Sequence, residues 1–195
     1  MHSAFHLGPI NQRCWKLMKS KSGELGNLRP MKHGIELRKA EKADLPLIQE
    51  FLKANDLCFE DIPDKKDSIV IARRNAQFIG VGGIERYGLY GLLRSVAIDR
   101  PFRGKGYGKE LCDKLISRAL SSGVKELYLL TTTAEAFFKR FGFERVDRKN
   151  APPVIQETSE FRELCPSSSV LMWKRLEKTS SPTLPADSSG DFEPT

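Results

Sequence analysis

The sequence has few cysteines and no long apolar run, and each absence excludes a class of protein. Among 195 residues only four are cysteines, with no C-x-x-C pair: Cys14, Cys58, Cys112 and Cys165. This spacing argues against a zinc site or a disulfide framework and fits a reducing compartment. No stretch approaches the roughly 20 apolar residues that a membrane-spanning helix needs. We therefore expect a soluble protein without a bound metal and without a membrane partner.

The body of the chain also has little excess of basic over acidic residues, although the net charge is +7. Residues 1–34 carry six basic residues and one acidic residue, a net +5, which leaves +2 for the other 161 residues. The basic excess is thus mainly a property of the N-terminal segment. No basic stripe with interleaved aromatic residues follows, so we expect no nucleic-acid partner.

The two ends of the sequence differ in composition from the middle. Residues 1–34 are basic and poor in acid, which is typical either of a disordered extension or of an organelle-targeting presequence; no apolar core of a secretory signal follows the charges. We expect a cytoplasmic protein, with plastid or mitochondrion as the alternative if this segment is a presequence. Residues 177–195 are rich in Ser and Pro and read as a disordered tail. One folded domain remains, at 35–176.

Within 35–176 the apolar pattern alternates between strand and helix periods and shows no internal repeat. Asp44 is a candidate helix cap, with Pro46 tolerated in the first turn and Leu45, Ile48, Phe51 and Leu52 on one face. Asn75 and Ala76 suit a hairpin link, and Gly123 suits a helix end. The pattern predicts strands at 35–40, 68–74, 77–87, 92–98, 125–132, 142–146 and 170–176, and helices from 44, over 111–120 and over 134–141. This order describes an α/β or α+β fold with a mixed sheet.

The stretch RGKGYGKEL, from Arg103 to Leu111, joins three glycines and three basic residues just before a helix. Such a loop can hold an anion with backbone N–H groups at the helix start. The P-loop pattern G-x-x-x-x-G-K-[ST] and the dinucleotide pattern G-x-G-x-x-G are both absent, since Lys109 stands where the latter needs a third glycine. What is present is R-x-x-G-x-G, at Arg103, Gly106 and Gly108.

This motif resembles the acyl-CoA signature [QR]-x-x-G-x-[GA] of the GNAT N-acetyltransferases. The order of elements around it, and the later stretch FFKRFGF, are similar to that family over about 140 residues. The resemblance implies a GNAT-like, mostly antiparallel mixed sheet flanked by helices, with a splayed strand pair for acyl-CoA. It also implies acetyl-CoA as co-substrate and no metal. The loop would hold the CoA pyrophosphate with Arg103, Gly104, Lys105, Gly106, Tyr107, Gly108 and Lys109.

Further site residues follow from the same resemblance. A bulged strand at Arg94–Ile98 would bind the pantetheine through the backbone of Val96, Ala97 and Ile98. Phe138 stands where many members place a tyrosine near the CoA sulfur; a phenyl ring can pack there but donates no proton. Another hydroxyl, from Thr132, Thr133 or Ser169, or water would then protonate the thiolate.

The base that deprotonates the amine is assigned to Glu85, near the end of the strand before the bulged one. Gly82 and Gly83 are expected to leave space beside it. The alternative is an exposed strand-end carboxylate paired with a neighbour such as Arg86. Glu60 and Asp61 are alternative amine-binding carboxylates.

The acceptor is predicted to be a small amino-acid-like amine. LYLLTTTAEAFFKRFGF (127–143) and ETSEFRELCPSSSVLM (157–172) resemble the GNAT subgroup found with arsenic-resistance genes, and the first is shared with short N-acetylglutamate synthase-like enzymes. Arg94 and Arg162 could bind a substrate carboxylate, with surface solvation as the alternative, and Thr132 is a further candidate. Antiparallel pairing should bring Glu85 and Arg94 close together. Cys165 is treated as a core or loop residue rather than an arsenic ligand.

Two other functions stay open at this point. A protein or peptide N-acetyltransferase would use the same loop with an open acidic groove, and a non-catalytic acyl-CoA sensor would keep the loop without a working base. The resemblance also allows a homodimer, which nothing in the residues requires.

Overall fold

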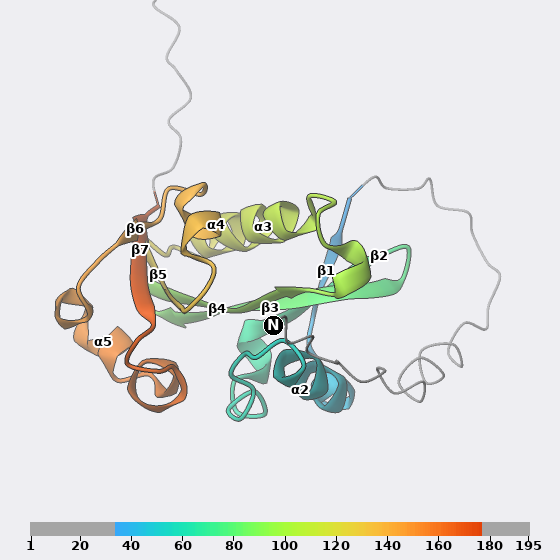
Figure 1. The fold of residues 1–195 in the computed structure, drawn as a ribbon, viewed down its shortest axis with the longest axis horizontal. Coiled ribbons are helices and arrows are strands. Elements are labelled where there is room, and N and C mark those ends of the chain that lie inside the picture. The colour runs from blue at the N-terminus through green and yellow to red at the C-terminus, as the bar shows by residue number, and fades with distance from the viewer. Residues whose placement is uncertain (1–33, 177–195) are drawn as a thin grey trace, which may run out of the picture. The chain divides into compact units, whose positions relative to one another are not determined.

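The computed structural model describes residues 34–176, so the expectations for the N-terminal extension and the C-terminal tail lie outside the described residues. The chain divides into two compact units, each built from two stretches of the sequence. Figure 1 draws the chain as a ribbon with its main helices and strands labelled. The first unit holds residues 34–83 and Ser95–Cys112, and the second holds Ile84–Arg94 and residues 113–176. The predicted folded domain, 35–176, lies within the described residues, and its edges stay a prediction.

The seven strands form one sheet in the order β1-β2-β3-β4-β5-β7-β6. β1 pairs with β2, β2 with β3, β5 with β7 and β6 with β7, all antiparallel, while β4 pairs with β5 in parallel. This mixed, mostly antiparallel sheet confirms the predicted fold class. The strands are β1 Glu36–Lys39, β2 Ile69–Arg74, β3 Gln77–Tyr87, β4 Tyr90–Ile98, β5 Glu126–Thr131, β6 Glu144–Arg145 and β7 Val170–Arg175.

The longer helices lie where the sequence pattern places them. The α-helices are α2 Leu45–Lys53, α3 Tyr107–Ser121, α4 Glu135–Lys139 and α5 Pro153–Gln156. Short 3₁₀ turns lie at η1 Lys42–Asp44, η2 Lys66–Ser68, η3 Arg100–Phe102 and η4 Arg148–Asn150, and a π-helical turn at η5 Glu160–Leu164. The sequence pattern did not predict α5 or η5, which fill the long connection before β7.

Positive φ angles account for the tight turns. Asn75 (φ +48°) and Ala76 (φ +61°) form the two-residue link between β2 and β3, as type I′ hairpins require. Gly88 (φ +64°) opens the link between β3 and β4, and Gly123 (φ +89°) ends α3. The predicted hairpin and helix end are therefore confirmed.

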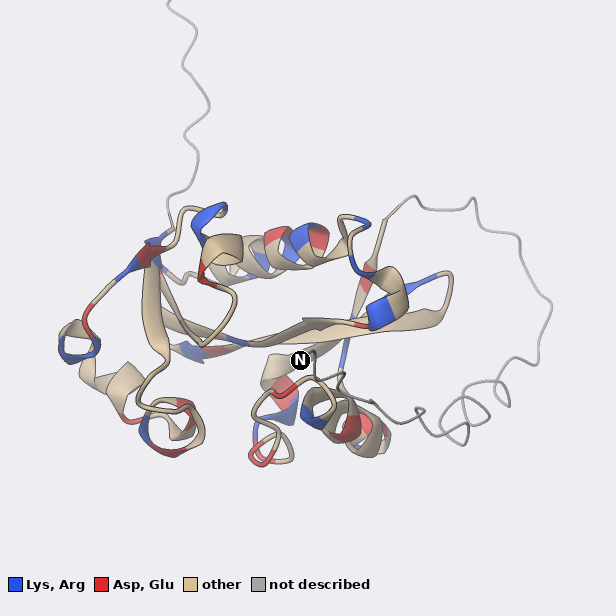
Figure 2. Cartoon of the chain, viewed as in Figure 1, with Lys and Arg blue, Asp and Glu red and all other residues tan. Residues whose placement is uncertain are grey.

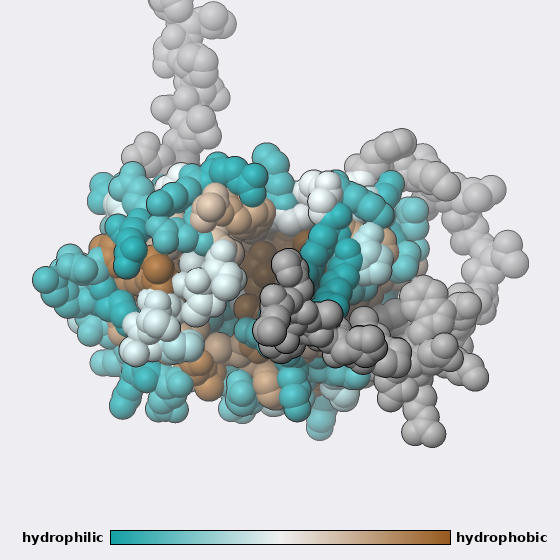
Figure 3. Space-filling view, in the orientation of Figure 1, coloured by the Kyte–Doolittle hydropathy of each residue, from teal (hydrophilic) through white to brown (hydrophobic). Residues whose placement is uncertain are grey.

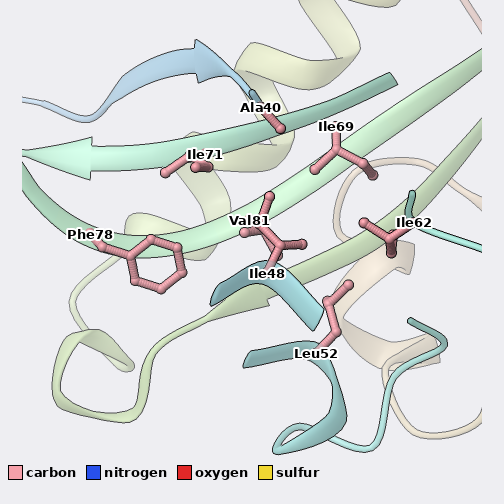
Figure 4. Close-up of a cluster of buried hydrophobic side chains, with 8 residues drawn as sticks. All are labelled: Ala40, Ile48, Leu52, Ile62, Ile69, Ile71, Phe78 and Val81. Carbon is pink, nitrogen blue, oxygen red and sulfur yellow. The ribbon is translucent and has the colours of Figure 1, made fainter. Parts of the chain in front are cut away.

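The core of the first unit lies between α2 and strands β2 and β3 (Figure 4). Its members are apolar side chains spaced at helical and strand periods: Ala40, Ile48, Leu52, Ile62, Ile69, Ile71, Phe78 and Val81. Phe51, partly buried, packs edge-on against Phe78 with ring centroids 5.0 Å apart. The helical face predicted around Ile48 and Leu52 thus packs on the sheet.

Asp44 does not cap α2 in the predicted way. No side-chain hydrogen bond from Asp44 reaches the α2 backbone. Its carboxylate accepts from the Glu41 N–H (2.8 Å) and from the Arg38 guanidinium (2.8 Å), which stabilises the preceding turn η1. Burial opposes ionisation of Asp44, but these hydrogen bonds and the Arg38 charge together lower the pKa of its carboxyl.

The core of the second unit mixes apolar and polar groups. Its buried members come from β4, β5, β7 and the connection before β7: Leu92, Tyr128, Ala151, Ile155 and Leu171. The Tyr128 hydroxyl donates to Glu126 (2.9 Å), which also accepts from the Trp173 indole N–H (3.1 Å). Burial and the hydrogen bond to Glu126 raise the pKa of the Tyr128 phenol. This tyrosine therefore stays a neutral structural donor.

Hydrophilic residues cover much of the described surface on the face drawn in Figure 3, with smaller brown areas between them. Among residues 34–176, no helix is long and apolar enough to cross a membrane.

Candidate active site

The glycine loop follows β4 and η3 and leads directly into α3, whose first residues are Tyr107, Gly108 and Lys109. Arg103 anchors its start: Nε donates to the Ile98 carbonyl (2.8 Å), and the guanidinium also donates to Asn55 Oδ1. The Lys105 ammonium lies over the Phe102 ring, 5.7 Å from its centroid. Figure 2 shows basic residues along this segment and its approach to α3. The loop is therefore held by contacts at its base while its basic tip stays exposed.

The backbone of this loop depends on two of its glycines. Gly104 has φ +74° and Gly106 has φ +84°, a region that L side chains rarely adopt. A Cβ built on either residue meets no heavy atom within 4 Å. Within residues 34–176, no atom fills the space beside these glycines, which leaves the backbone open to a ligand that binds N–H groups.

The backbone of the strand before the loop indicates a bulge within 94–98, the segment where the family resemblance implies one. Ser95 in β4 has φ +56°, unusual for a non-glycine residue inside a strand. Beyond it, the Asp99 N–H donates to the Ile79 carbonyl (2.8 Å), and a Cβ on Gly80 would lie 2.2 Å from the Ala97 carbonyl oxygen. Gly80 is thus required by the close approach of β3 and the bulged end of β4.

The ladder between β4 and β5 is short. Among the described residues, pairing joins Tyr90, Gly91 and Leu92 to Glu126, Leu127 and Tyr128. β4 continues to Ile98 and β5 to Thr131 beyond the last pair. A ladder of this length fits the splayed strand pair that the family resemblance implies.

A buried ion pair joins the hairpin β3–β4 in the second unit. Arg94 Nη1 donates to Glu85 Oε1 at 2.5 Å, and the Tyr87 hydroxyl donates to Glu85 Oε2. The side chains of Glu85 and Arg94 are 5% and 0% exposed. The predicted proximity of Glu85 and Arg94 is confirmed, and the alternative of an exposed strand-end carboxylate is wrong.

A second carboxylate contacts the same guanidinium. Glu160, on η5, has Oε2 at 3.4 Å from Arg94 Nε, and its side chain is 8% exposed. The Cys165 thiol lies 3.8 Å from Glu160 Oε1. We define the Glu85–Arg94–Glu160 cluster by these three side chains. It places two carboxylates on different edges of one buried guanidinium.

The other predicted site residues of the second unit differ in how far they are exposed to solvent. Thr132 and Thr133 are exposed in the turn after β5, and Arg162 is exposed on η5. Ser169 is buried and accepts from Arg148 Nη1 (2.9 Å). Phe138 is buried edge-on against Phe143, at 5.8 Å between ring centroids. The catalytic, substrate and cofactor roles of these residues stay predictions.

The alternative carboxylates lie in the first unit. Glu60 is exposed and accepts from the Phe59 N–H (3.0 Å), whereas Asp61 is half-buried. Gly83 does not leave the open space that was predicted beside Glu85: a Cβ there would lie 2.6 Å from Ile69 Cδ1 and 2.9 Å from the Ser68 carbonyl oxygen. Its missing side chain instead allows β2 and β3 to pack closely.

Sequence reasoning missed Glu160, Tyr87 and Asn55 as partners of the predicted site residues. The alternation of β3 offers a signal for Tyr87, because residues two apart on a strand share a face. For Glu160 and Asn55 no local pattern is available, since each reaches an arginine that is distant in sequence. Within residues 34–176, no group of three His, Cys, Asp or Glu side chains is arranged to hold a metal ion.

Comparison with known proteins identifies the family. The model of the Acetyltransferase (GNAT) family matches residues 35–143, which is more than half of the chain. The chain belongs to the GNAT acetyltransferase family. An uncharacterised N-acetyltransferase of Chlorobaculum tepidum, CT2212, is 31% identical over 97 residues, which is 49% of this chain and 62% of that protein. The chain thus spans less than two thirds of this relative's length.

Solved structures share the fold at low sequence identity. N-acetylglutamate synthase from Neisseria gonorrhoeae, complexed with coenzyme A and L-arginine, superposes with TM-score 0.63 at 19% identity, covering 74% of this chain and 34% of that one. Rv2747 from Mycobacterium tuberculosis, in complex with CoA and NLQ, gives 0.62 at 20% identity, covering 73% and 99%. A GNAT-family acetyltransferase from Staphylococcus aureus Mu50 gives 0.59 at 21% identity, covering 74% and 100%. These likenesses support the GNAT fold that the sequence predicts.

The residues present fit an acyl-CoA ligand. Gly104 and Gly106 hold positive φ angles beside open space, the positive end of α3 follows at once, and β4 is bulged at Ser95. Each feature favours a ligand bound through the backbone, with phosphate groups at the loop.

Proposed function

We propose that the protein is an N-acetyltransferase that moves the acetyl group of acetyl-CoA directly to the amine of a small amino-acid-like acceptor. The observation that carries this proposal is the glycine loop, whose positive-φ backbone and open space suit a pyrophosphate at the start of α3. Membership of the GNAT family supports the reaction class. Acetyl-CoA supplies an activated acetyl thioester; the new bond is an amide, and the leaving group is the CoA thiol.

In this proposal the chain's own residues bind phosphate, orient the pantetheine and accept a proton. Arg103 holds the base of the loop, and Lys105 and Lys109 add positive charge for the phosphates. The backbone of Val96, Ala97 and Ile98 beyond the bulge would orient the pantetheine, with Phe138 as a packing contact. Glu85 would take the proton that the ammonium must lose before it attacks.

The acceptor class rests on the buried pair of Glu85 and Arg94. An amino acid carries one amine and one carboxylate, so it offers a charge partner to each member of the pair. The enclosure of Glu85 by Tyr87 and Arg94 favours a small acceptor over a peptide lying in an open groove. Arg162, exposed on η5, and Thr132, exposed after β5, remain further candidates for contacts with the acceptor.

The experiment that tests this function is incubation with acetyl-CoA and a panel of amines, with release of CoA thiol as the readout. We expect turnover with small amino acids and weaker turnover with simple amines. Turnover only with peptides would indicate a protein N-acetyltransferase. Acetyl-CoA binding without turnover on any amine would indicate a non-catalytic sensor.

The Arg94→Ala variant tests the carboxylate role of Arg94 in the same assay. The ratio of rates for acid-bearing and acid-free amines is the measured quantity, because this ratio does not depend on the fraction of folded enzyme. Losing a buried charge partner costs about 2–5 kcal/mol, so use of amino acids should fall far more than use of simple amines. Equal losses for both classes would exclude the role.

Localisation and assembly are part of the proposal too. We propose a cytoplasmic protein, or a plastid or mitochondrial one if residues 1–34 act as a presequence, which fusion of that segment to a reporter would test. A homodimer is testable by light scattering of the full chain.

A further inference from the structure

The two carboxylates of the Glu85–Arg94–Glu160 cluster contact Arg94 at different nitrogen atoms and at different distances. Glu85 takes the Nη1 side at 2.5 Å, and Glu160 lies on the Nε side at 3.4 Å. A guanidinium is planar and its N–H groups point in fixed directions, so contacts on two edges restrict its rotation. The position of the Arg94 guanidinium relative to Glu85 therefore depends on its contact with Glu160.

The charge of Arg94 is also divided between the two carboxylates. All three side chains are at most 8% exposed, so water screens their interaction weakly. A carboxylate beside Arg94 weakens the positive potential that Arg94 exerts on its other partner. Tyr87 and Arg94 face Glu85 directly, and Arg94 and Cys165 face Glu160. Removing the Glu160 charge should make Glu85 a weaker proton acceptor.

Glu160 is held in place by the segment that carries it. The Cys165 N–H donates to the Glu160 carbonyl (3.0 Å) and closes the η5 turn. Arg148 donates to the Phe161 carbonyl (2.6 Å) and to Ser169 Oγ (2.9 Å), so it ties both ends of this segment together. π-helical turns are rare and occur often at functional sites. The local backbone therefore fixes the carboxylate at Arg94.

We propose that Glu160 is a positioning residue for Glu85: acting through Arg94, it fixes the guanidinium and limits how much of its positive charge reaches the base. This inference rests on the proposed function and on Glu85 as its base. Glu160 itself exchanges no proton with the acceptor in this scheme. Arg94 keeps Glu85 ionised, and the contribution of Glu160 is to keep Glu85 basic enough to accept a proton from an ammonium.

The test compares Glu160→Gln with wild type in the full chain. Glutamine keeps the shape of the side chain and removes its negative charge. The positive potential of Arg94 at Glu85 is then no longer offset by Glu160. We expect the acidic limb of the profile of kcat/KM against pH to move down by about one pH unit. The plateau of kcat should fall about threefold because a weaker base accepts the proton less readily. The matched control is Glu163→Gln, an exposed residue of the same turn η5, which should leave both quantities unchanged.

A second background separates positioning from general damage to the fold. In Glu85→Gln enzyme, Glu160→Gln should cause no further shift of the profile, since its effect passes through Glu85. An equal loss of activity in both backgrounds, or a lower rate with an unmoved acidic limb, would overturn the proposal. Absence of turnover by the wild type on every amine would instead overturn the proposed function.

A direct titration keeps the inference testable without turnover. The side-chain carboxyl signal of Glu85, followed by carbon NMR with labelled glutamate, should titrate at lower pH in Glu160→Gln than in wild type. If Glu160→Gln does not fold, Glu160→Asp serves in the same titration; its shorter reach should move the midpoint in the same direction by less. An unmoved midpoint in the folded variant would overturn the proposal.

Discussion

The glycine loop and the Glu85–Arg94–Glu160 cluster are built in opposite ways. The loop is one continuous stretch, 103–109, and its shape depends on the positive φ angles of Gly104 and Gly106. Its tip is exposed and basic. The cluster joins β3, β4 and η5 and is almost wholly buried, so its shape depends on charge contacts between distant residues. Local backbone geometry thus defines the loop, and long-range electrostatics defines the cluster.

Because of this difference, substitutions in the two regions should affect ligand binding and fold stability to different degrees. Contacts with neighbouring atoms at Gly104 and Gly106 contribute little to the stability of the loop, so a substitution there should lower ligand affinity more than it lowers the free energy of unfolding. The cluster holds ionised groups away from water, so a change there should affect both the fold and the chemistry. Substitutions in each of the two regions test this contrast.

The Arg94→Ala substitution should cause the largest loss of stability. It leaves two buried carboxylates without the guanidinium that contacts both, and breaking a buried pair in this way costs about 3–5 kcal/mol. Urea unfolding at neutral pH measures the loss. The control is Arg162→Ala, an exposed arginine, which should change the unfolding free energy by less than about 0.5 kcal/mol. A loss as small as that of the control would show that the cluster is not held by Arg94.

The Gly106→Val substitution should abolish acetyl-CoA binding while leaving most of the stability. A branched side chain at φ +84° costs about 1–2 kcal/mol of backbone strain and places Cβ where a phosphate would lie. Calorimetric titration should show at least about a hundredfold loss of affinity, since the backbone N–H contacts and charges at the loop act together.

Gly123→Val is the matched control for the loop. Gly123 also has a positive φ, +89°, and also has no heavy atom within 4 Å of an added Cβ, but it lies at the other end of α3. Its variant should lose similar stability and keep its affinity for acetyl-CoA. Unchanged affinity in folded Gly106→Val would exclude the loop as the phosphate site.

The same contrast explains what the sequence predicted well. The loop, its glycines and the helix after it form one stretch, so their order and spacing identify them without a structure. The hairpin turn at Asn75 and Ala76 and the end of α3 at Gly123 were found for the same reason. The β4 bulge was predicted from the family resemblance rather than from Ser95, whose residue type gives no sign of a positive φ.

Residues whose side chains form charge contacts outside the local helix or strand pattern were missed or misplaced. Glu160 reaches Arg94 only after η5 folds, and the sequence pattern predicted no turn there. Asp44 precedes an apolar helical face, as a cap does, yet Arg38 and the Glu41 N–H compete for its carboxylate. In both cases a charge contact, rather than a local propensity, decides where the side chain lies.

The Gly80→Ala substitution tests whether the bulged strand β4 contributes to the same ligand site as the glycine loop. Its Cβ would lie 2.2 Å from the Ala97 carbonyl oxygen, a backbone atom that cannot rotate away. We expect a loss of about 1–3 kcal/mol in stability. Because the oxygen belongs to the strand proposed to orient the pantetheine, affinity for acetyl-CoA should also fall, by less than in Gly106→Val. Binding that survives with full affinity would separate this strand from the ligand site.

The smallest expected effect concerns Arg38 and Asp44, an ion pair like those of the cluster but nearer to solvent, with side chains 34% and 17% exposed. The hydrogen bonds and charge of Arg38 lower the pKa of Asp44 below its ordinary value of 3.8 despite partial burial. A carboxyl with a lowered folded-state pKa stabilises the fold above its ordinary pKa, and this contribution is lost as the pH falls through the lowered value.

Solvent screening limits the contribution of this pair, so Asp44→Asn should cost about 0.5–1 kcal/mol near neutral pH, and the difference from wild type should disappear as the pH falls through the lowered pKa of Asp44. Urea unfolding of both proteins across this range measures the difference. Asp67→Asn is the control, because Asp67 pairs with Lys66 at 2.9 Å but its side chain is 93% exposed, and we expect no measurable change. A loss in Asp44→Asn as large as that in Arg94→Ala would mean that burial is not what distinguishes the cluster from an ordinary ion pair.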